Sequence, residues 1–453
     1  MSAEVQPKHE NSSDKRILTI VFFTVFLDMA GFSIIFPLFP HMLNYYLAQE
    51  GHTGMLGSLV AFLDNLSALL GGARAQGHVI LFGGFLSGVY ALLQFICAPI
   101  FGSLSDRYGR RPILLTAIAG LAFSYGIWIF AGTFAMIVVA RVVGGLMSGS
   151  ISTASAVIAD VTLGVNRSRG MAILGFGIGV AFMIGPAVGG LSSLFDPTER
   201  WPSLAAYGIN PYSAAALAAF AMAMTNWILV AAMLPETLPD PRLPAPTRRL
   251  MNPIALFSTT EYPGVTLTNV TYFVFLLAFS GMMEFAVTFY VTDRFGFQPG
   301  QIALMFLFVG VILAGTQATY VRKWSGVIGP KRMSMHGLMC IIPGLLLIGF
   351  ATAPWHLYLA LVLTSVGSAQ VRPCMSALVS LYTPVREQGR ILGVFRSLEG
   401  LTRAISPLIA CFLYWKLGSS QAYYVAAAVT LVALLLARGL PAPDALRETE
   451  SAA

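Results

Sequence analysis

Charge is what this sequence has least of. Only 10% of its 453 residues are Asp, Glu, Lys or Arg, whereas 56% are hydrophobic. A water-soluble chain of this length needs far more charge to cover its surface, so we expect the apolar excess to face lipid. The net charge of +7 would suit nucleic acid only if the basic residues gathered on one solvent-exposed face. They lie in short runs between apolar segments instead, which argues against a nucleic-acid partner.

Cysteine and histidine are also scarce. The four cysteines lie inside apolar stretches, without the spacing of a disulfide framework or a zinc site: Cys97, Cys340, Cys374 and Cys411. The six histidines are scattered, and no nucleophile motif or His-Glu-x-x-His helix occurs. The sequence therefore gives no support for an enzyme, a metal site or a bound cofactor.

A cleavable signal peptide is not evident either. The polar start, residues 1–16, leads into an apolar run that is too long for a signal core and has no small-residue cleavage site behind it. Long apolar runs are what the sequence does have. Runs of about 20 residues, the length that crosses a hydrocarbon core, occur at 17–43, 78–103, 112–132, 134–158, 170–191, 213–234, 269–291, 300–321, 333–352, 356–381, 390–415 and 421–438.

Prolines divide these twelve spans into two sets of six. The segment 235–268 carries seven prolines together with Arg242, Arg248 and Arg249, which is typical of a loop. We therefore predict an all-α polytopic membrane protein with twelve transmembrane helices. Its expected parts are a cytoplasmic tail (1–16), a first six-helix bundle (17–234), a cytoplasmic Pro-rich linker (235–268), a second six-helix bundle (269–438) and a cytoplasmic tail (439–453).

The basic residues predict the orientation, because cytoplasmic loops carry an excess of Lys and Arg. With both termini cytoplasmic, the outer loops hold only four of the 27 basic residues: Arg74, Arg200, Arg294 and Lys416. If residues 55–73 formed a thirteenth span, every later loop would lie on the opposite side of the membrane. Asp64 and Asn65 at its centre favour an interfacial helix within a long outer loop, 47–77.

The turn between the second and third spans contains the most specific motif, Gly-Ser-Leu-Ser-Asp-Arg-Tyr-Gly-Arg-Arg-Pro at 102–112. Two glycines would let helix ends approach closely, and the aspartate could pair with the basic residues. An ordinary positive-inside loop would explain the arginines but not the aspartate and the glycines at this spacing. We interpret the turn as a cytoplasmic gate motif consisting of Gly102, Asp106, Arg107, Gly109, Arg110 and Arg111.

Glycines also mark the fourth and fifth spans. Arg141, Gly145 and Gly149 recur every four residues and so share one helix face, from which the arginine either points inward or snorkels to the outer surface. A phosphate-binding loop would need a strand before the glycines of the fifth span. Inside a membrane span they predict close helix packing and a proline bend at Gly175, Gly179, Gly185, Pro186, Gly189 and Gly190.

Ionisable residues inside the spans are candidates for the substrate or proton site, because a charge near mid-span costs about 2.5 to 3.5 kcal/mol on insertion scales. Offsets of three and four residues place the three charges of the eleventh span along one face. An alternative is that the glutamate there only neutralises its two arginine neighbours. The candidates are Asp28, Arg141, Glu284, Gln317, Arg372, Arg396, Glu399 and Arg403.

Together these motifs resemble the drug and proton antiporter branch of the major facilitator superfamily. The turn at 102–112 is similar to its loop signature, the fifth-span glycines to its antiporter motif, and 27–40 to its first helix. Four further segments look like the tetracycline-transporter-like group of animals, suspected organic anion carriers: 81–84, 93–99, 235–239 and 396–404. Glu399 departs from the small residue of that group. The resemblance implies two pseudo-symmetric bundles and alternating access.

We therefore expect a secondary transporter of a small amphipathic organic solute. Four embedded arginines against three embedded carboxylates favour an organic anion, and the resemblance of the fifth span implies proton-coupled export. The expected partners are the solute, protons and the lipid bilayer, with a monomer as the functional unit in a plasma or inner membrane. Two alternatives stay open: a receptor or scaffold that does not transport, and a lipid or lysolipid flippase, which needs a lateral opening to lipid.

Overall fold

The computed structural model describes residues 12–51, 53–70, 77–162, 165–238, 262–383 and 388–441. The regular elements of its first half are α1 (Ser12–Ser33), η1 (Phe36–Leu38), α2 (Phe39–Glu50), α3 (Gly54–Leu70), α4 (Gly77–Tyr108), α5 (Arg110–Ile129), α6 (Phe134–Met147), α7 (Ser150–Val161), α8 (Val165–Ser192), α9 (Pro197–Arg200), η2 (Pro202–Tyr207) and α10 (Ser213–Met233). Those of its second half are α12 (Pro263–Ser280), η3 (Gly281–Ala286), α13 (Val287–Phe295), α14 (Pro299–Thr316), η4 (Gln317–Val321), α15 (Arg322–Ile328), α16 (Pro330–Phe350), α17 (Pro354–Leu381), α18 (Gln388–Leu417) and α19 (Ser419–Arg438).

The predicted fold class is confirmed, because each of the twelve expected spans falls on a helix or on a run of consecutive helices. In the described ranges, ten helical segments are long and apolar enough to cross a membrane by length and composition. The remaining two spans are α17 and α18, which carry Arg372, Arg396, Glu399 and Arg403. These two helices are thus less apolar than the other spans, and they carry most of the embedded charge of the second half.

Several spans are interrupted where the sequence disfavours a regular α-helix. The first span turns at residues 34–35, just before Pro37 and Pro40, because a proline cannot continue the hydrogen-bond pattern of the preceding turn. The fourth span breaks at Ser148 and Gly149, between α6 and α7. Spans seven and eight contain the π-helical turns η3 and η4, a distortion that often marks functional sites.

Matching hydrogen bonds and turns relate the two halves. Gly109 precedes α5 with φ of +100°, and Gly329 precedes α16 with φ of +79°, a conformation that only glycine adopts easily. The Tyr46 hydroxyl donates to the Ala131 carbonyl beyond the end of α5. Likewise the Tyr290 hydroxyl donates to the Ile348 carbonyl near the end of α16. The third and ninth spans are thus anchored in the same way in each half.

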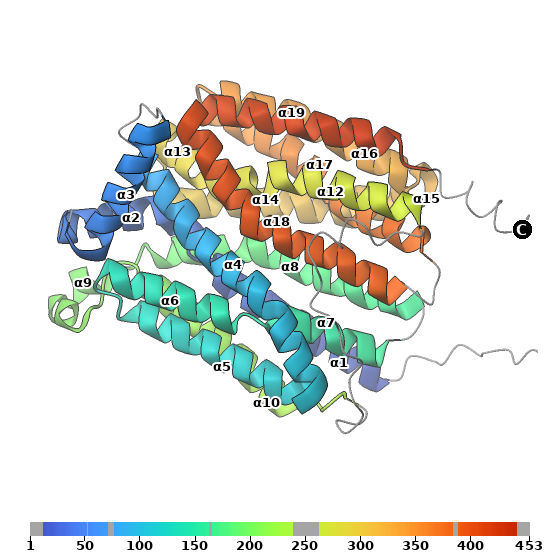
Figure 1. Cartoon of the computed structure of the whole chain (residues 1–453), viewed down its shortest axis with the longest axis horizontal. Coiled ribbons are helices and arrows are strands. Elements are labelled where there is room, and N and C mark those ends of the chain that lie inside the picture. The colour runs from blue at the N-terminus through green and yellow to red at the C-terminus, as the bar shows by residue number, and fades with distance from the viewer. Residues whose placement is uncertain are drawn as a thin grey trace, which may run out of the picture.

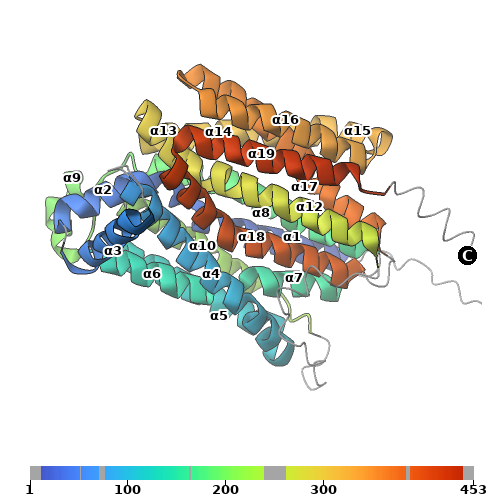
Figure 2. The same ribbon diagram turned by 45° about the horizontal axis from the view of Figure 1, so that its top comes forward.

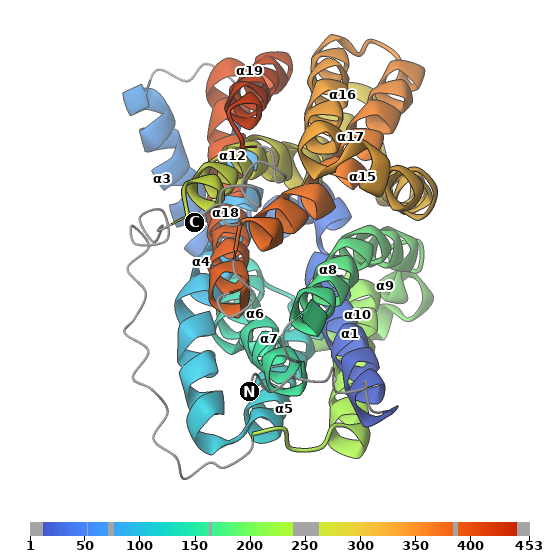
Figure 3. The same ribbon diagram turned by 90° about the vertical axis from the view of Figure 1, so that its right-hand side faces the viewer.

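The two halves form two bundles of helices, which Figure 3 shows in a view down the helix axes. One end of the molecule carries the turn with Asp106 and is called here the Asp106 end. The opposite end carries α2, α3 and α9 and is called the α3 end (Figure 2). The expected outer loop 47–77 contains α3, which packs against α2, α4 and α6. Most of the expected linker, residues 239–261, lies outside the described residues.

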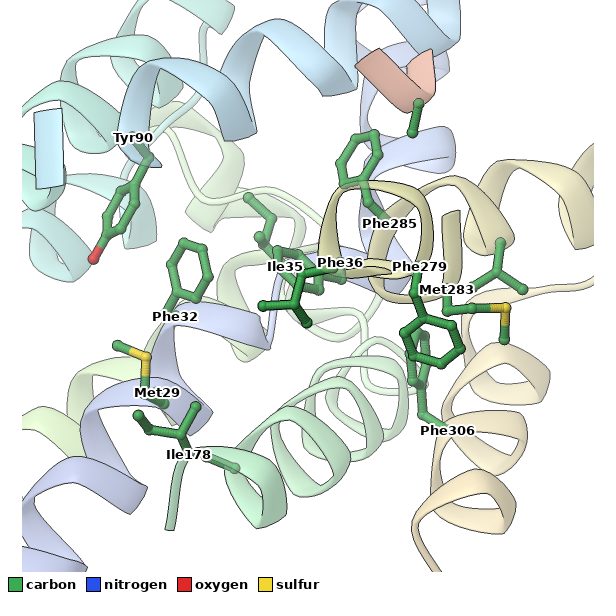
Figure 4. Packing of buried hydrophobic residues seen from close by; sticks show 14 of the residues in the cluster. Met29, Phe32, Ile35, Phe36, Tyr90, Ile178, Phe279, Met283, Phe285 and Phe306 are labelled. Carbon is green, nitrogen blue, oxygen red and sulfur yellow. The ribbon is translucent and has the colours of Figure 1, made fainter. Parts of the chain in front are cut away.

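The bundles are packed tightly near the α3 end. A Cβ on Gly83 would lie 2.4 Å from the Phe289 ring, and one on Gly84 would lie 2.7 Å from the Cys411 sulfur. Figure 4 shows Phe36 of the first bundle and Phe285 of the second in this region, with ring centroids 6.3 Å apart. Side chains from both halves therefore close this end.

The bundles are farther apart toward the Asp106 end. Figure 1 shows α4 and α18 side by side near the α3 end and diverging toward the other. Consistent with this, a Cβ on Gly179 of α8, or on Gly393 or Gly400 of α18, would meet no atom within 4 Å. The structure is thus the conformation in which the bundles meet at the α3 end and separate at the Asp106 end.

Candidate functional site

Asp28 lies on α1 in the first bundle, where its side chain is buried. Its Oδ2 atom accepts a hydrogen bond from the Ser150 hydroxyl at the start of α7. Its Oδ1 atom is buried without a hydrogen-bond partner, and no ion pair to Asp28 occurs among the described residues. A buried carboxylate oxygen without a partner is costly while the group is charged, so Asp28 is suited to take up a proton.

Arg141 is buried within the first bundle. Its guanidinium carbon lies 5.2 Å from the centroid of the Trp128 ring and 5.7 Å from that of Tyr90. Aromatic faces attract a cation at such distances. The side chain therefore points inward and does not snorkel to the outer surface. Gly145 and Gly149 on the same span pack closely on Tyr90 and Phe101 of α4.

The second bundle contains an ion pair between Arg372 of α17 and Glu284 of the π-helical turn η3. The same Arg372 nitrogen lies 3.5 Å from the Ser280 hydroxyl, whereas its Nε atom is buried without a hydrogen-bond partner. The π-helical turn gives Glu284 a backbone position that an uninterrupted α-helix would not. Gln317 opens the other π-helix, η4, and forms no hydrogen bond to these charges in the described residues.

A second ion pair joins neighbouring turns of α18. Arg396 Nη1 donates to Glu399 Oε2 at 2.7 Å, and the Tyr272 hydroxyl of α12 donates to Glu399 Oε1 at 2.5 Å. Both carboxylate oxygens of Glu399 therefore have partners. Sequence reasoning missed Tyr272, because a tyrosine in an apolar span carries no signal of its role until the fold brings it to a carboxylate.

Two arginines of α18 reach the first bundle. Arg403 Nη1 lies 3.6 Å from the sulfur of Met29, the residue after Asp28 on α1. Arg396 rests against α8, where a Cβ on Gly175 would lie 2.6 Å from its guanidinium nitrogen. Arg403 also interacts electrostatically with Glu284, Glu399, Arg372 and Arg396. The structure thus gathers the charges of the second bundle into one group that faces the first.

The arginines differ in how they are neutralised. Arg372 and Arg396 each pair with a glutamate. By contrast, no ion pair between a carboxylate and Arg141 or Arg403 occurs within the described residues. Within the described residues, these two side chains are thus cations of the candidate site that lack an ion pair with a carboxylate.

The glycines of α8 pack closely at most positions, as expected. A Cβ on Gly185 would lie 2.1 Å from the Ser33 hydroxyl oxygen, and one on Gly189 would lie 1.9 Å from the Ile34 carbonyl oxygen. Gly190 approaches Pro299 of α14 in the other bundle, at 2.2 Å from the carbonyl oxygen. Gly179 is the exception, because a Cβ there meets nothing within 4 Å. The expected close packing at Gly179 was therefore wrong for this conformation.

At the Asp106 end, the gate motif forms a compact charge network. The Arg110 guanidinium pairs with Asp106 of α4 and with Asp160 of α7, the latter at 2.8 Å. Glu236, which follows α10, accepts hydrogen bonds from the backbone N–H groups of Arg110 at 2.9 Å and Arg111 at 3.1 Å. A carboxylate at a helix N-terminus satisfies N–H groups that have no partner within the helix. The network therefore ties α4, α5, α7 and the end of α10 together.

The remaining gate residues have separate surroundings. Arg111 donates to the Ala231 carbonyl of α10 at 2.5 Å, and Arg107 lies over the Tyr108 ring. The expected close approach at Gly102 is not found, because a Cβ there would meet no atom within 4 Å. Gly109 does need to be glycine, since its φ is positive and a Cβ would lie 2.6 Å from Glu236.

We expect Asp106→Asn to slow transport turnover on the order of tenfold, while substrate affinity stays nearly unchanged. The reason is that Asp106 holds α4 to Arg110, and α4 is a helix on which the two bundles meet. Initial rates and binding on the same purified protein would measure both quantities. Glu199→Gln, at an exposed position of the α3 end, is the control. Normal turnover with a large loss of affinity would contradict the assignment.

Comparison with known proteins fits this arrangement. The Major Facilitator Superfamily matches residues 21–326 and 316–453, so the chain belongs to that superfamily of membrane transporters. It is 32% identical to the major facilitator superfamily domain-containing protein 10 of Bos taurus over 96% of this chain and 95% of that one. It is also 28% identical to the class C tetracycline resistance protein of Escherichia coli, over 92% and 95%.

Solved structures agree. The crystal structure of the human organic anion transporter MFSD10 (TETRAN) shares the fold with a TM-score of 0.73 and 29% identity, over 95% of this chain and all of that one. That of a D-xylose-proton symporter gives a TM-score of 0.70 at 15% identity, over 95% and 99%, which shows the fold alone. The expected resemblance to the tetracycline-transporter-like group is thereby confirmed.

Proposed function

We propose that this protein exports an amphipathic organic anion in exchange for protons. The observation that carries the proposal is Arg403, which extends from α18 to Met29 of the first bundle and has no carboxylate ion pair in the described residues. A half-buried arginine that has no carboxylate ion pair in the described residues is suited to bind a carboxylate or sulfonate. The human relative MFSD10 is described as an organic anion transporter, which supports the same class of solute.

Arg372 and Arg396 complete the proposed anion site. Each already shares its charge with a glutamate, so an entering anion competes with Glu284 and Glu399 for the two guanidinium groups. The site thus combines Arg403, a cation without a carboxylate ion pair in the described residues, with two cations that can be drawn away from their partners. Such competition couples anion binding to the charge state of the carboxylates.

Asp28 is the proposed proton carrier. One of its oxygens has no partner, whereas both oxygens of Glu399 are occupied by Tyr272 and Arg396. Glu399 is assigned to the anion site instead, where it competes with the anion for Arg396. Asp28 and Arg403 lie on opposite sides of the interface between the bundles, as alternating access requires.

We further propose that both chain termini and the Asp106 end are cytoplasmic, in the plasma or inner membrane, and that the monomer is the working unit. The excess of Lys and Arg outside the outer loops supports this orientation. Epitope tags at either terminus are expected to bind antibody only after the membrane is permeabilised. Antibody access in intact cells would contradict the orientation.

The decisive experiment is transport in proteoliposomes under an imposed pH gradient, with organic anions and cations of matched size. We expect anions to move, and their movement to collapse when a protonophore dissipates the gradient. Asp28→Asn is expected to keep exchange of anion against anion but to lose acceleration by the pH gradient, since it removes the proton and not the anion site. Gradient-driven transport in the Asn variant would reject Asp28 as the carrier.

Two outcomes would replace the proposal. Binding of an anion without movement would indicate a receptor or scaffold, and movement of a labelled lysolipid in preference to anions would indicate a flippase. A flippase needs a lateral opening that leads to its binding site. The groove between α14, α16 and α17 of the second bundle is lined by none of the charged candidate residues.

A further inference from the structure

A groove of about 640 Å³ lies on the second bundle, away from the charged site. It is lined by α14 with η4, by α16, and by Val366 and Gln370 of α17. Helix α16 packs on α17 and α19, so it belongs to the periphery of the bundle. The exposed side chains beside the groove are large and apolar, including Val311 of α14 and Met339 of α16. The groove therefore opens toward lipid.

The lining changes from apolar to polar along the groove. Ile312 and Val366 lie deepest in the membrane, because they are farthest from the Asp106 end along α14 and α17. Thr316, Thr319, Tyr320 and His336 line the part nearer that end. A ligand that fills this groove must thus combine an apolar tail with hydrogen-bonding groups.

Beyond the polar part stand basic residues. Lys323 follows Thr319 by four residues and Arg332 precedes His336 by four, so each lies one helical turn closer to the Asp106 end. Both side chains, like that of Arg322, are exposed. No Asp or Glu occurs between Asp293 and Glu387. The mouth of the groove is therefore positively charged.

We propose that this groove is a binding site for an anionic glycerophospholipid of the leaflet at the Asp106 end. The phosphate would lie between Lys323 and Arg332, the ester region against the Thr319, Tyr320 and His336 side chains, and an acyl chain against Ile312 and Val366. A basic residue near a membrane surface attracts anionic lipid. The apolar, membrane-embedded inner part of the groove indicates a lipid and not free phosphate.

Occupancy would influence the helix that joins the bundles. Helix α14 carries one wall of the groove, and its other face packs on α8, where a Cβ on Gly310 would lie 1.5 Å from the Met183 sulfur. A bound lipid therefore touches an element that moves when the bundles change their relative position. The proposal does not depend on which solute is transported.

Native mass spectrometry of the delipidated full-length protein tests the site. We expect phosphatidylglycerol adducts to persist at lipid concentrations several-fold lower than those of phosphatidylcholine with the same acyl chains. Gly315→Leu should abolish this preference, because Gly315 lines the groove and has open space around it. Gly326→Leu, at an equally open position on α15 outside the groove, should retain it.

The charge at the mouth provides a second test. Lys323→Gln combined with Arg332→Gln is expected to remove the preference for phosphatidylglycerol, while Arg438→Gln, exposed at the same end on α19, keeps it. If Gly315→Leu fails to fold, this double variant still tests whether the groove binds anionic lipid. Equal retention of the two lipids by the wild type, a preference unchanged in the groove variants, or displacement of the adduct by inorganic phosphate would each overturn the proposal.

Discussion

Gly185→Leu is expected to abolish transport while the protein still inserts into the membrane. A Cβ at this position would lie 2.1 Å from the Ser33 hydroxyl oxygen and 2.4 Å from the Ala30 carbonyl oxygen, both on α1. Backbone cannot move aside as a flexible side chain can, so leucine must push α8 away from α1. Pro186 lies inside this part of α8, where it removes one backbone hydrogen bond of the helix. The displaced helix carries Gly190, which contacts the second bundle through Pro299.

Gly126→Leu is the matched control, since it makes the same chemical change in the first bundle, on α5, at a position with no atom within 4 Å. We expect it to insert normally and to transport far better than Gly185→Leu in the same proteoliposomes. Surface expression and elution as a monodisperse species establish that both variants insert. Full activity in Gly185→Leu, or equal loss in both variants, would show that close packing of α8 on α1 is not the cause.

The sequence was sufficient to predict which segments span the membrane, because a run of about 20 apolar residues has few alternatives to a transmembrane helix. It could not predict the interruptions. Gly149 and Glu284 sit in apolar runs that look continuous, yet one lies at a break between α6 and α7 and the other in a π-helical turn. Such local distortions depend on packing between helices, which hydropathy does not describe.

The candidate site was predicted as a set of embedded charges, but not as a set of contacts. Offsets along α18 indicated that Arg396 and Glu399 could pair, and they do. The pairing of Arg372 with Glu284 joins residues 88 positions apart, so no local spacing could reveal it. Tyr272 and Asp160 were missed for the same reason, since each acquires its role only when separate helices meet.

Arg403→Ala is expected to weaken binding of the organic anion roughly ten- to a hundredfold, because a charge-assisted hydrogen bond contributes about 1.5 to 3 kcal/mol. Arg403→Lys should bind with intermediate affinity, since lysine keeps the charge but loses the planar fork. The measurement is substrate binding at several pH values on purified protein. Arg403 forms no carboxylate ion pair in the described residues, so its removal leaves no unpaired glutamate behind.

Arg372 needs a different design, because it is paired with Glu284. Arg372→Ala alone would leave that partly buried glutamate without its cation, which is destabilising and can impair binding through the fold. The double variant Arg372→Ala/Glu284→Gln removes both charges, so no glutamate is left without its cation. If Arg372 contacts the anion, we expect binding to stay weak in the double variant, with Arg372→Lys partially active. Restoration of wild-type affinity in the double variant would assign Arg372 to structure, and unchanged binding in Arg403→Ala would reject the proposed anion site.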